Sequence, residues 1–268
     1  MPAIDRAVLL EAISALTGSA VRPLAEGRGE HSPHEEELTI TNFLPTVFSP
    51  SSSADPPSPC PASPALPEEA ALSELSLWGA SASMKELLVD MENFLDPLYD
   101  YDFRCGSGSS ECSRGGEPYT RPWGWYRFAL KVLDKYPDGN AWLGSYGWRS
   151  QSSPGEWPVS FHGTSIEGAR GITGSHYKTD DGQCYGRGIY STPNIDIAEG
   201  YTMFKEFRSK NGRTYEVIMQ NRINPKKRVI TGKEDYWLIP VPEGSSAEQE
   251  KQVVEASIRP YGILIKEV

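Results

Sequence analysis

The pattern of apolar and polar residues separates a polar N-terminal stretch from a globular C-terminal part. Apolar residues between positions 4 and 16 recur at helical spacing, which predicts a short amphipathic helix with nothing nearby to pack on. Positions 49–67 hold seven prolines, mostly among serines and alanines, and such a stretch buries too little surface to offset its ordering entropy. We therefore expect residues 1–80 to be a largely disordered leader, either without a role or as a delivery signal for a secretion system.

Short strands are predicted after residue 120, with Gly, Pro and Asn turns between them. The predicted strands are Arg127–Leu133, Pro158–His162, Thr214–Gln220, Tyr236–Pro240 and Gly262–Lys266. Helical spacing is limited to Met84–Leu95 and to the short stretches Ser165–Ile172 and Pro193–Phe204. Because no βαβ periodicity is present, this pattern indicates an α+β domain over residues 81–268.

Composition and charge narrow the class of function. The net charge of −10 and the pI of about 5.0 disfavour a general nucleic-acid or membrane-surface binder, because both roles need a cationic face. The four cysteines have no CxxC pairing, so we expect free thiols, no metal site and no disulfide framework. No stretch approaches 18 consecutive apolar residues, and the N-terminus lacks the cationic and apolar runs of a secretory signal peptide.

The candidate chemistry begins where a predicted strand ends in His162-Gly163-Thr164. Gly163 has no Cβ, so a ligand carboxamide can approach its backbone N–H and C=O groups. A second run, Gly-Arg-Gly-Ile-Tyr, ends at Tyr190, and Tyr201 follows eleven residues later, after a turn and a predicted helix. Two such rings can hold a flat heteroaromatic ring between them. Together the two segments predict a site for a planar ring that carries a carboxamide.

These residues, in this order and spacing, resemble the nicotinamide pocket of the diphtheria-toxin-like and poly(ADP-ribose)-polymerase-like transferases. The resemblance implies an ADP-ribosyltransferase fold, with two packed, mostly antiparallel small sheets and short helices, and NAD as a substrate. It implies that His162 hydrogen-bonds the ribose next to the adenine and that Gly163 binds the carboxamide, with Thr164 completing the motif. Tyr190 and Tyr201 then stack on the nicotinamide.

The third element of that family's pattern is a carboxylate just before a Tyr-containing strand near the C-terminus. Here Glu234 and Asp235 precede Tyr236, so alignment on the tyrosine places Asp235, and not a glutamate, at that position. A carboxylate there stabilises the positive charge that develops on the ribose as the glycosidic bond breaks, and it can deprotonate an incoming hydroxyl. Either residue or both can act, and a carboxylate within Tyr99–Phe103 is a competing candidate.

A fuller set of motifs is similar to the CteC-type effector family, from about residue 90 to the end. The motifs are Tyr-Asp-Tyr-Asp-Phe at 99–103, Arg-Pro-Trp-Gly-Trp at 121–125, Trp-Leu-Gly at 142–144, Pro-Gly-Glu-Trp-Pro-Val at 154–159, Gln-Asn-Arg-Ile-Asn-Pro at 220–225 and Ile-Arg-Pro-Tyr-Gly at 258–262. The resemblance implies mono-ADP-ribosylation of a ubiquitin threonine, which blocks host ubiquitination, by an Asp-plus-Glu pair. It also implies a secreted effector that acts in the host cytosol; otherwise we expect a cytoplasmic protein.

The expected partner is therefore ubiquitin. We expect the protein to be a monomer, and its negative net charge suits binding to a basic face of the partner. The Trp- and Tyr-rich residues within 95–150 either form a targeting surface or pack in the core. Lys178 is the nearest match to the cation that meets the adenosine side of NAD in the polymerase-like pattern. Lys226, Lys227 and Arg228 either meet a NAD phosphate or are solvated.

Two other functions stay open at this point. A degenerate transferase fold that holds NAD or ADP-ribose without turnover would account for the unusual pair at 234–235. An RNA 2′-phosphotransferase also uses NAD and a His-Gly-Thr-like strand. That enzyme needs a basic RNA surface, so the net charge of −10 disfavours it.

Overall fold

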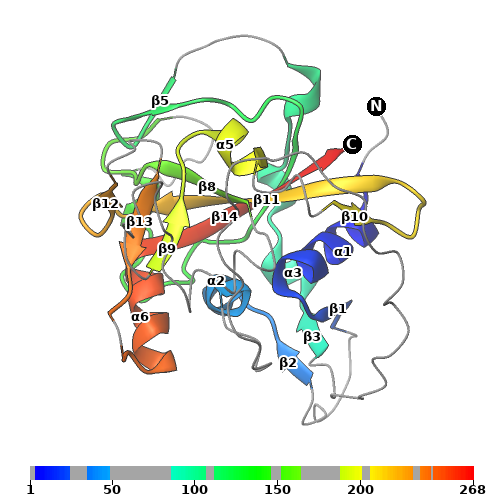
Figure 1. Cartoon of the computed structure of the whole chain (residues 1–268), viewed down its shortest axis with the longest axis horizontal. Helices are drawn as coiled ribbons and strands as arrows, with labels where there is room; N and C mark the ends of the chain where they lie inside the picture. The colour runs from blue at the N-terminus through cyan, green and yellow to red at the C-terminus, as the bar shows by residue number, and fades with distance from the viewer. Residues whose placement is uncertain are drawn as a thin grey trace, which may run out of the picture.

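The computed structural model describes residues 4–24, 35–48, 86–106, 112–145, 152–163, 188–200, 206–231, 236–242 and 244–268. Two ten-residue antiparallel strands, β11 (Thr214–Ile223) and β14 (Ile258–Glu267), run through the middle of the molecule (Figure 1). Nearly all residues of both strands are buried. A strand that is covered on both faces favours consecutive apolar residues, and β14 has them at Ile263-Leu264-Ile265.

These two strands belong to a six-stranded antiparallel sheet in the order β10–β11–β14–β7–β4, in which β8 also pairs with β11. Its shorter strands are β4 (Tyr101–Asp102), β7 (Tyr126–Ala129), β8 (Val159–Gly163) and β10 (Phe207–Arg208). The strands predicted at 158–162, 214–220 and 262–266 are confirmed. The strand predicted at 127–133 is confirmed only up to Ala129, where β7 ends.

Three smaller sheets complete the described part of the chain. The first is antiparallel and is made by β12 (Val229–Ile230), β13 (Trp237–Pro240) and β9 (Gly188–Ser191). The others are the hairpin β5 (Cys112–Arg114) with β6 (Glu117–Tyr119), and a parallel sheet of β1 (Ala20–Pro23), β3 (Glu86–Val89) and β2 (Glu35–Glu37). The protein is thus a mixed α+β structure with several small, mostly antiparallel sheets, which confirms the predicted α+β class; the described residues form four sheets, whereas the resemblance implied two.

Short helices connect and cover the sheets. They are α1 (Arg6–Thr17), α2 (Ile40–Phe48), α3 (Met91–Phe94), α5 (Ile195–Gly200) and α6 (Ala247–Ser257), with 3-10 turns η1 (Pro97–Tyr99), η2 (Phe103–Cys105) and η3 (Ala141–Leu143). In α6, Ser246 and Gln249 cap each other's backbone N–H groups, which is the capping-box arrangement. Figure 1 shows α1, α2 and α6 below the central strands and α5 above them.

The N-terminal helices are part of the folded domain. The apolar face of α1, which includes Leu9 and Ile13, is buried in the common core, and the helix contacts β10 and β11. Helix α2 packs against α6 and β14, and its Phe43 is buried. The expectation that residues 1–80 are largely disordered is therefore wrong for 4–24 and 35–48. The amphipathic helix finds its apolar partner in a sheet more than 190 positions away in sequence.

Of the segment predicted as one helix over Met84–Leu95, the described part, from Glu86 on, is a strand followed by a single helical turn. Leu87 and Val89 are buried in β3, the middle strand of the parallel sheet. Asp90 then caps α3 by accepting hydrogen bonds from the backbone N–H groups of Glu92 and Asn93. The prediction was wrong because neighbouring strands on both sides of β3 override a local helical spacing.

Candidate functional site

Strand β8 carries the first part of the predicted site, His162 and Gly163, at its C-terminal end. In its ladder with β11, His162 stands opposite Met219 and Gly163 stands opposite Ile218. The start of the strand is held by a hydrogen bond of 3.0 Å from the backbone N–H of Ile223 to the carbonyl of Pro158. The position of His162 is therefore set by pairing with β11, a strand whose residues are nearly all buried.

The imidazole of His162 is almost completely buried, with an exposed fraction of 4%. Its Nδ1 lies 2.6 Å from the carbonyl oxygen of Tyr190, and because a carbonyl only accepts, Nδ1 carries the hydrogen. Burial lowers the pKa of His162 to about 4, although the hydrogen bond to Tyr190 acts in the opposite direction. At neutral pH the ring is thus uncharged, and Nε2 is its acceptor nitrogen.

Tyr190 lies on β9, between β13 on one side and β8 on the other. Backbone hydrogen bonds of 2.7 and 3.0 Å between Phe161 and Thr192 join β9 to the free edge of β8. Gly188, which starts β9, passes so close to β13 that a Cβ there would lie 2.1 Å from the carbonyl oxygen of Ile239, so only glycine fits. The tyrosine ring itself is half-buried. The two sequence motifs are therefore neighbours in space.

The other predicted site residues lie outside the described residues: Thr164, Lys178, Tyr201, Glu234 and Asp235. Their described neighbours in sequence are well anchored. Helix α5 ends at Gly200, directly before Tyr201, and an ion pair between Glu199 and Lys266 ties this helix to β14. Of the helix predicted over Pro193–Phe204, Ile195–Gly200 is helical as α5, Pro193 and Asn194 precede it, and 201–204 lie outside the described residues.

The carboxylate pair at 234–235 falls between the two strands of the β12–β13 hairpin. The residues on either side of the gap are joined by a hydrogen bond of 3.0 Å from the N–H of Thr231 to the carbonyl of Tyr236. In the same sheet, Leu238 of β13 pairs directly with Tyr190 of β9. The hairpin that contains the predicted catalytic pair is thus attached to the strand that contains the predicted stacking tyrosine.

The three basic residues before this hairpin, at positions 226–228, differ in their surroundings. Lys226 and Lys227 are exposed, in line with the solvated interpretation. Arg228 instead forms an ion pair with Glu117, and its guanidinium carbon lies 3.8 Å from the centre of the Trp237 ring. This arginine therefore joins β6 to β13.

The competing carboxylates, Asp100 and Asp102, lie at the opposite edge of the main sheet. Strands β11, β14 and β7 separate β4 from β8, which is roughly 19 Å at about 4.8 Å per strand. Asp102 is paired with Arg104 at 2.7 Å, and hydrogen bonding to this guanidinium lowers the pKa of Asp102. Asp100 accepts the backbone N–H of Ala129 at 2.7 Å, and its partial burial raises the pKa of Asp100. The sheet order thus speaks against either of them sharing a site with His162.

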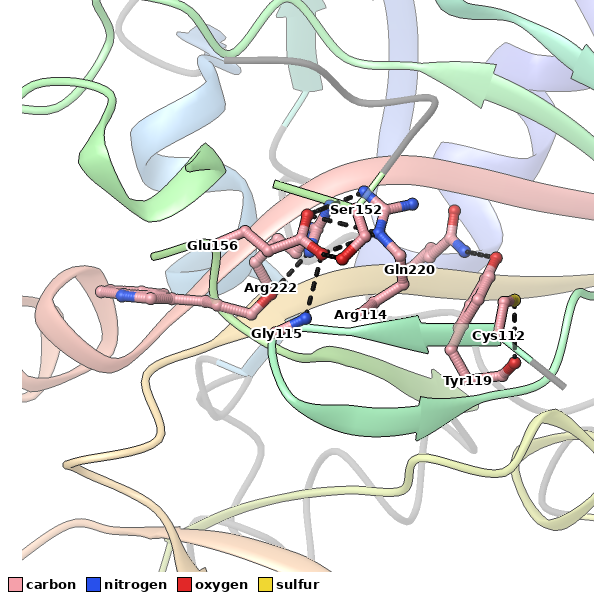
Figure 2. Close-up of polar contacts among 9 residues, drawn as sticks. Cys112, Arg114, Gly115, Tyr119, Ser152, Glu156, Gln220 and Arg222 are labelled. Atoms are coloured by element: carbon pink, nitrogen blue, oxygen red, sulfur yellow. Dashed lines mark hydrogen bonds and ion pairs between the residues drawn. The ribbon is translucent and has the colours of Figure 1, made fainter. Parts of the chain in front are cut away.

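A buried ion cluster, which the sequence analysis did not foresee, lies around Glu156 (Figure 2). The Glu156 carboxylate is 3.0 Å from Nε of Arg114 and 3.1 Å from a terminal nitrogen of Arg222, and it accepts the Gly115 N–H at 2.9 Å. Burial on its own would raise the pKa of Glu156, but the hydrogen bond from Arg114 and the charge of Arg222 lower it overall. Burial also lowers the pKa of Arg222, whose side chain is fully buried.

This ion cluster holds the neighbouring chain segments in place and does not supply a reactive group. Both carboxylate oxygens of Glu156 are occupied by cations or N–H groups, so the residue is not a free base. Arg222 also donates to the carbonyl of Trp157 at 2.6 Å, which fixes the segment that enters β8. Glu156 and Arg222 belong to two separate motifs, at 154–159 and 220–225. The sequence signal for this cluster was weak, because Arg222 lies in β11 together with the polar residues Glu216, Gln220 and Asn221, and nothing local marks the arginine as buried.

The described aromatic residues at 95–150 are mainly core residues. Trp125 and Trp142 are buried, so core packing is the correct interpretation for both. Trp142 and Tyr136 lie beside the guanidinium of Arg259, at 5.4 and 4.0 Å from their ring centres, and Arg259 donates to Asp138 at 2.8 Å. Among the residues of this segment that the structure describes, the exposed large apolar side chains are Leu98, Tyr101 and Leu133.

Cys105 and Cys112 are free thiols, and Cys60 and Cys184 lie outside the described residues. The described ranges contain no group of three or more His, Cys, Asp or Glu side chains arranged to hold a metal ion. Within these ranges no helix has both the length and the apolar character needed to cross a bilayer.

Compared with known proteins, the chain matches no protein-family model and no curated protein sequence. A function must therefore be inferred from the motifs and from the contact between His162 and Tyr190.

Proposed function

We propose that the protein is an NAD-dependent mono-ADP-ribosyltransferase that modifies a hydroxyl of another protein, with a threonine of ubiquitin as the acceptor. The observation that carries this proposal is the contact of 2.6 Å between His162 Nδ1 and the Tyr190 carbonyl, 28 positions apart. It joins the two sequence motifs that resemble a nicotinamide pocket.

The chemistry of these groups supports binding of NAD. A neutral His162 that donates through Nδ1 offers Nε2 as an acceptor for a ribose hydroxyl. Gly163, which is half-buried at the strand end, presents backbone groups that suit a carboxamide. The half-buried ring of Tyr190 suits stacking on a pyridine ring. These three groups recognise different parts of one dinucleotide.

In the proposed reaction, the bond between ribose C1′ and the nicotinamide nitrogen breaks, and nicotinamide leaves with the bonding electrons. A threonine hydroxyl oxygen attacks C1′, and its proton passes to a carboxylate of the pair Glu234 and Asp235. The ribose carries positive charge while the old bond is broken and the new bond is not yet formed. A carboxylate held at the ribose therefore stabilises the transition state more than the bound NAD.

A binding module that holds NAD or ADP-ribose without turnover is the second candidate. The departure at 234–235, where the usual glutamate position holds Asp235, favours it. Both candidates need the same pocket, and they differ only in whether a bound NAD is consumed.

The deciding experiment is incubation of the full-length protein with NAD and ubiquitin, followed by intact-mass measurement of the ubiquitin. The transferase proposal expects the addition of one ADP-ribose, which fragmentation then assigns to a threonine. If calorimetry detects NAD binding but the mass of ubiquitin does not change, the result favours the binding module without turnover. No NAD binding overturns both, and transfer of a 2′-phosphate from an RNA substrate would identify the phosphotransferase.

The carboxylate assignment is tested by Glu234→Gln and Asp235→Asn. We expect each variant to bind NAD nearly as well as the wild type, while the rate of transfer falls on the order of 100-fold, because general acid–base and charge stabilisation act in the transition state. Glu248→Gln, at an exposed position of α6, is the matched control and keeps full activity. Full activity in both 234 and 235 variants shows that the catalytic carboxylate lies elsewhere.

A further inference from the structure

A row of polar side chains lies on the face of β8 and β11 that carries His162. Ser160 comes two residues before His162 in β8 and stands directly opposite Asn221 in the ladder with β11. Residues at i and i+2 of a strand share a face, as do directly opposite residues of neighbouring strands. All three side chains are buried. They form a continuous polar row beside Met219 and Ile223, which are apolar and buried on the same face.

Asn221 is the unusual member of this row. Its side chain is 0% exposed, and neither Oδ1 nor Nδ2 has a hydrogen-bond partner within the described ranges; the Ser160 hydroxyl has none there either. The preceding Gln220 points to the opposite face, where its Nε2 donates to the Tyr119 hydroxyl at 3.1 Å (Figure 2), and only its Oε1 lacks a partner within the described ranges. A buried amide without partners destabilises the fold, so a native protein that keeps one satisfies it from outside the chain, with a bound water, ion or ligand.

The backbone is also irregular at this position. The register between β11 and β14 shifts between Gln220, which faces Gly262, and Asn221, which faces Pro260, so that Tyr261 is an extra residue on β14. Bulges of this kind redirect side chains and are over-represented next to active sites. The bulge and the amide without partners thus mark the same point of the sheet.

We propose that Asn221 and Ser160 bind the adenine of NAD, as a continuation of the site that begins at Gly163 and His162. This inference rests on the proposed function. An asparagine amide matches the edge of adenine, since Oδ1 accepts from the N6 amino group while Nδ2 donates to N7. The order along β8 agrees with this: the resemblance puts the carboxamide at Gly163 and the adenine-side ribose at His162. Ser160 follows about 10 Å from Gly163, at roughly 3.3 Å per residue.

The test is the substitution Asn221→Leu in the full-length chain, with calorimetric measurement of NAD, AMP and nicotinamide binding. The unfolding midpoint without ligand is measured on the same samples. We expect NAD and AMP to bind about tenfold more weakly, which corresponds to the loss of paired hydrogen bonds, while nicotinamide binding stays the same. The midpoint stays unchanged or rises, because the amide without partners is gone. If Asn221 has only a structural role, Asn221→Leu gives the reverse result: the unfolding midpoint falls and AMP binding is unchanged.

Gln220→Leu is the matched control, because it removes an amide that is bonded on the other face. It lowers the midpoint and leaves AMP affinity unchanged. Ser160→Ala provides a second test that does not depend on folding of the leucine variant, and it weakens AMP binding.

Unchanged AMP affinity in Ser160→Ala and in any folded Asn221→Leu protein overturns the inference, while NAD binding by the wild type still supports the proposed function. Loss of nicotinamide binding in place of AMP binding overturns the adenine assignment. A wild-type protein that binds neither NAD nor AMP removes the proposed function and this inference together.

Discussion

At the residue scale, His162 combines a fixed tautomer with a suppressed charge. The carbonyl of Tyr190 holds the hydrogen on Nδ1, and burial keeps the ring neutral. A neutral ring with a defined acceptor nitrogen recognises a hydroxyl without the desolvation penalty of a buried imidazolium. The same burial makes the stability of the protein depend on pH.

The first prediction concerns this pH dependence. The pKa of His162 is about 4 in the folded protein and near 6.5 when the chain is unfolded, so below pH 6.5 the unfolded chain takes up the proton first. The free energy of unfolding therefore falls by about 3 kcal/mol from this group as the pH drops from 6.5 to 4. His162→Asn removes the titration and keeps a donor for the Tyr190 carbonyl. Urea titrations of both proteins at several pH values measure the difference, and identical pH profiles would contradict the assignment.

The second prediction at this scale concerns the ring of Tyr190. Tyr190→Ala removes the stacking surface and weakens NAD binding by about tenfold or more, whereas Tyr190→Phe keeps the ring and retains most of the affinity. Tyr101→Ala is the control, because Tyr101 is exposed on β4, at the far edge of the main sheet. Calorimetric dissociation constants separate these cases. Wild-type affinity in Tyr190→Ala means that this ring does not contact NAD.

At the scale of elements, the ion cluster around Glu156 ties the β5–β6 hairpin, the segment before β8 and strand β11 together. Gly115 lies in the hairpin turn with a positive φ of 61°, and a Cβ there would come within 2.3 Å of the Pro158 nitrogen. The hairpin therefore packs backbone against backbone on the residues that lead into β8. The position of His162 depends on this packing, since His162 lies only four residues beyond Pro158.

The third prediction is that Glu156→Ala destabilises the protein strongly. Without this carboxylate, the fully buried Arg222 has lost its compensating charge, which costs about 3–5 kcal/mol in unfolding free energy. Glu267→Ala breaks the exposed ion pair with Arg213 and changes the same quantity by at most about 1 kcal/mol. Denaturant titrations of the two variants provide the comparison. Equal effects would show that the cluster is not an anchor.

At the scale of the whole molecule, the N-terminal helices share one core with the main sheet. Residues of α1 and α2 belong to the same continuous group of buried apolar side chains as β11 and β14. Helices α1 and α2 are thus a covering layer of the domain that carries the candidate site. A delivery function for this part of the chain has to be compatible with its folded role.

The fourth prediction follows from this shared core. Leu9→Ala, at a fully buried position of α1, lowers the free energy of unfolding by about 2–5 kcal/mol, as expected for a cavity in a packed core. Leu98→Ala is the matched control, since Leu98 is 91% exposed, and it changes stability by no more than about 0.5 kcal/mol. Chemical denaturation of both variants tests this. A neutral Leu9→Ala would show that α1 is not packed on the domain.

Sequence by itself determined the α+β class, most strands of the main sheet and the two motifs that meet in space. These features depend on short-range periodicity and on residue chemistry, which are visible in a window of a few residues. Pro158–His162 and Gly262–Lys266 are recognisable as strands because their own apolar positions specify them, although β14 begins four residues earlier than predicted, at Ile258. The same holds for His162 and Tyr190 as candidate ligand-binding residues, because each belongs to a distinctive local motif.

Tertiary structure alone decided that residues 86–89 form a strand, that α1 and α2 cover the main sheet, and that Glu156 meets Arg114 and Arg222. It also placed Asp100 and Asp102 far from β8, and Asn221 beside Ser160. The physical reason is that these outcomes depend on partners that are distant in sequence. A buried charge or a helical face is stable only where the fold provides its counterpart, and no local pattern contains that information.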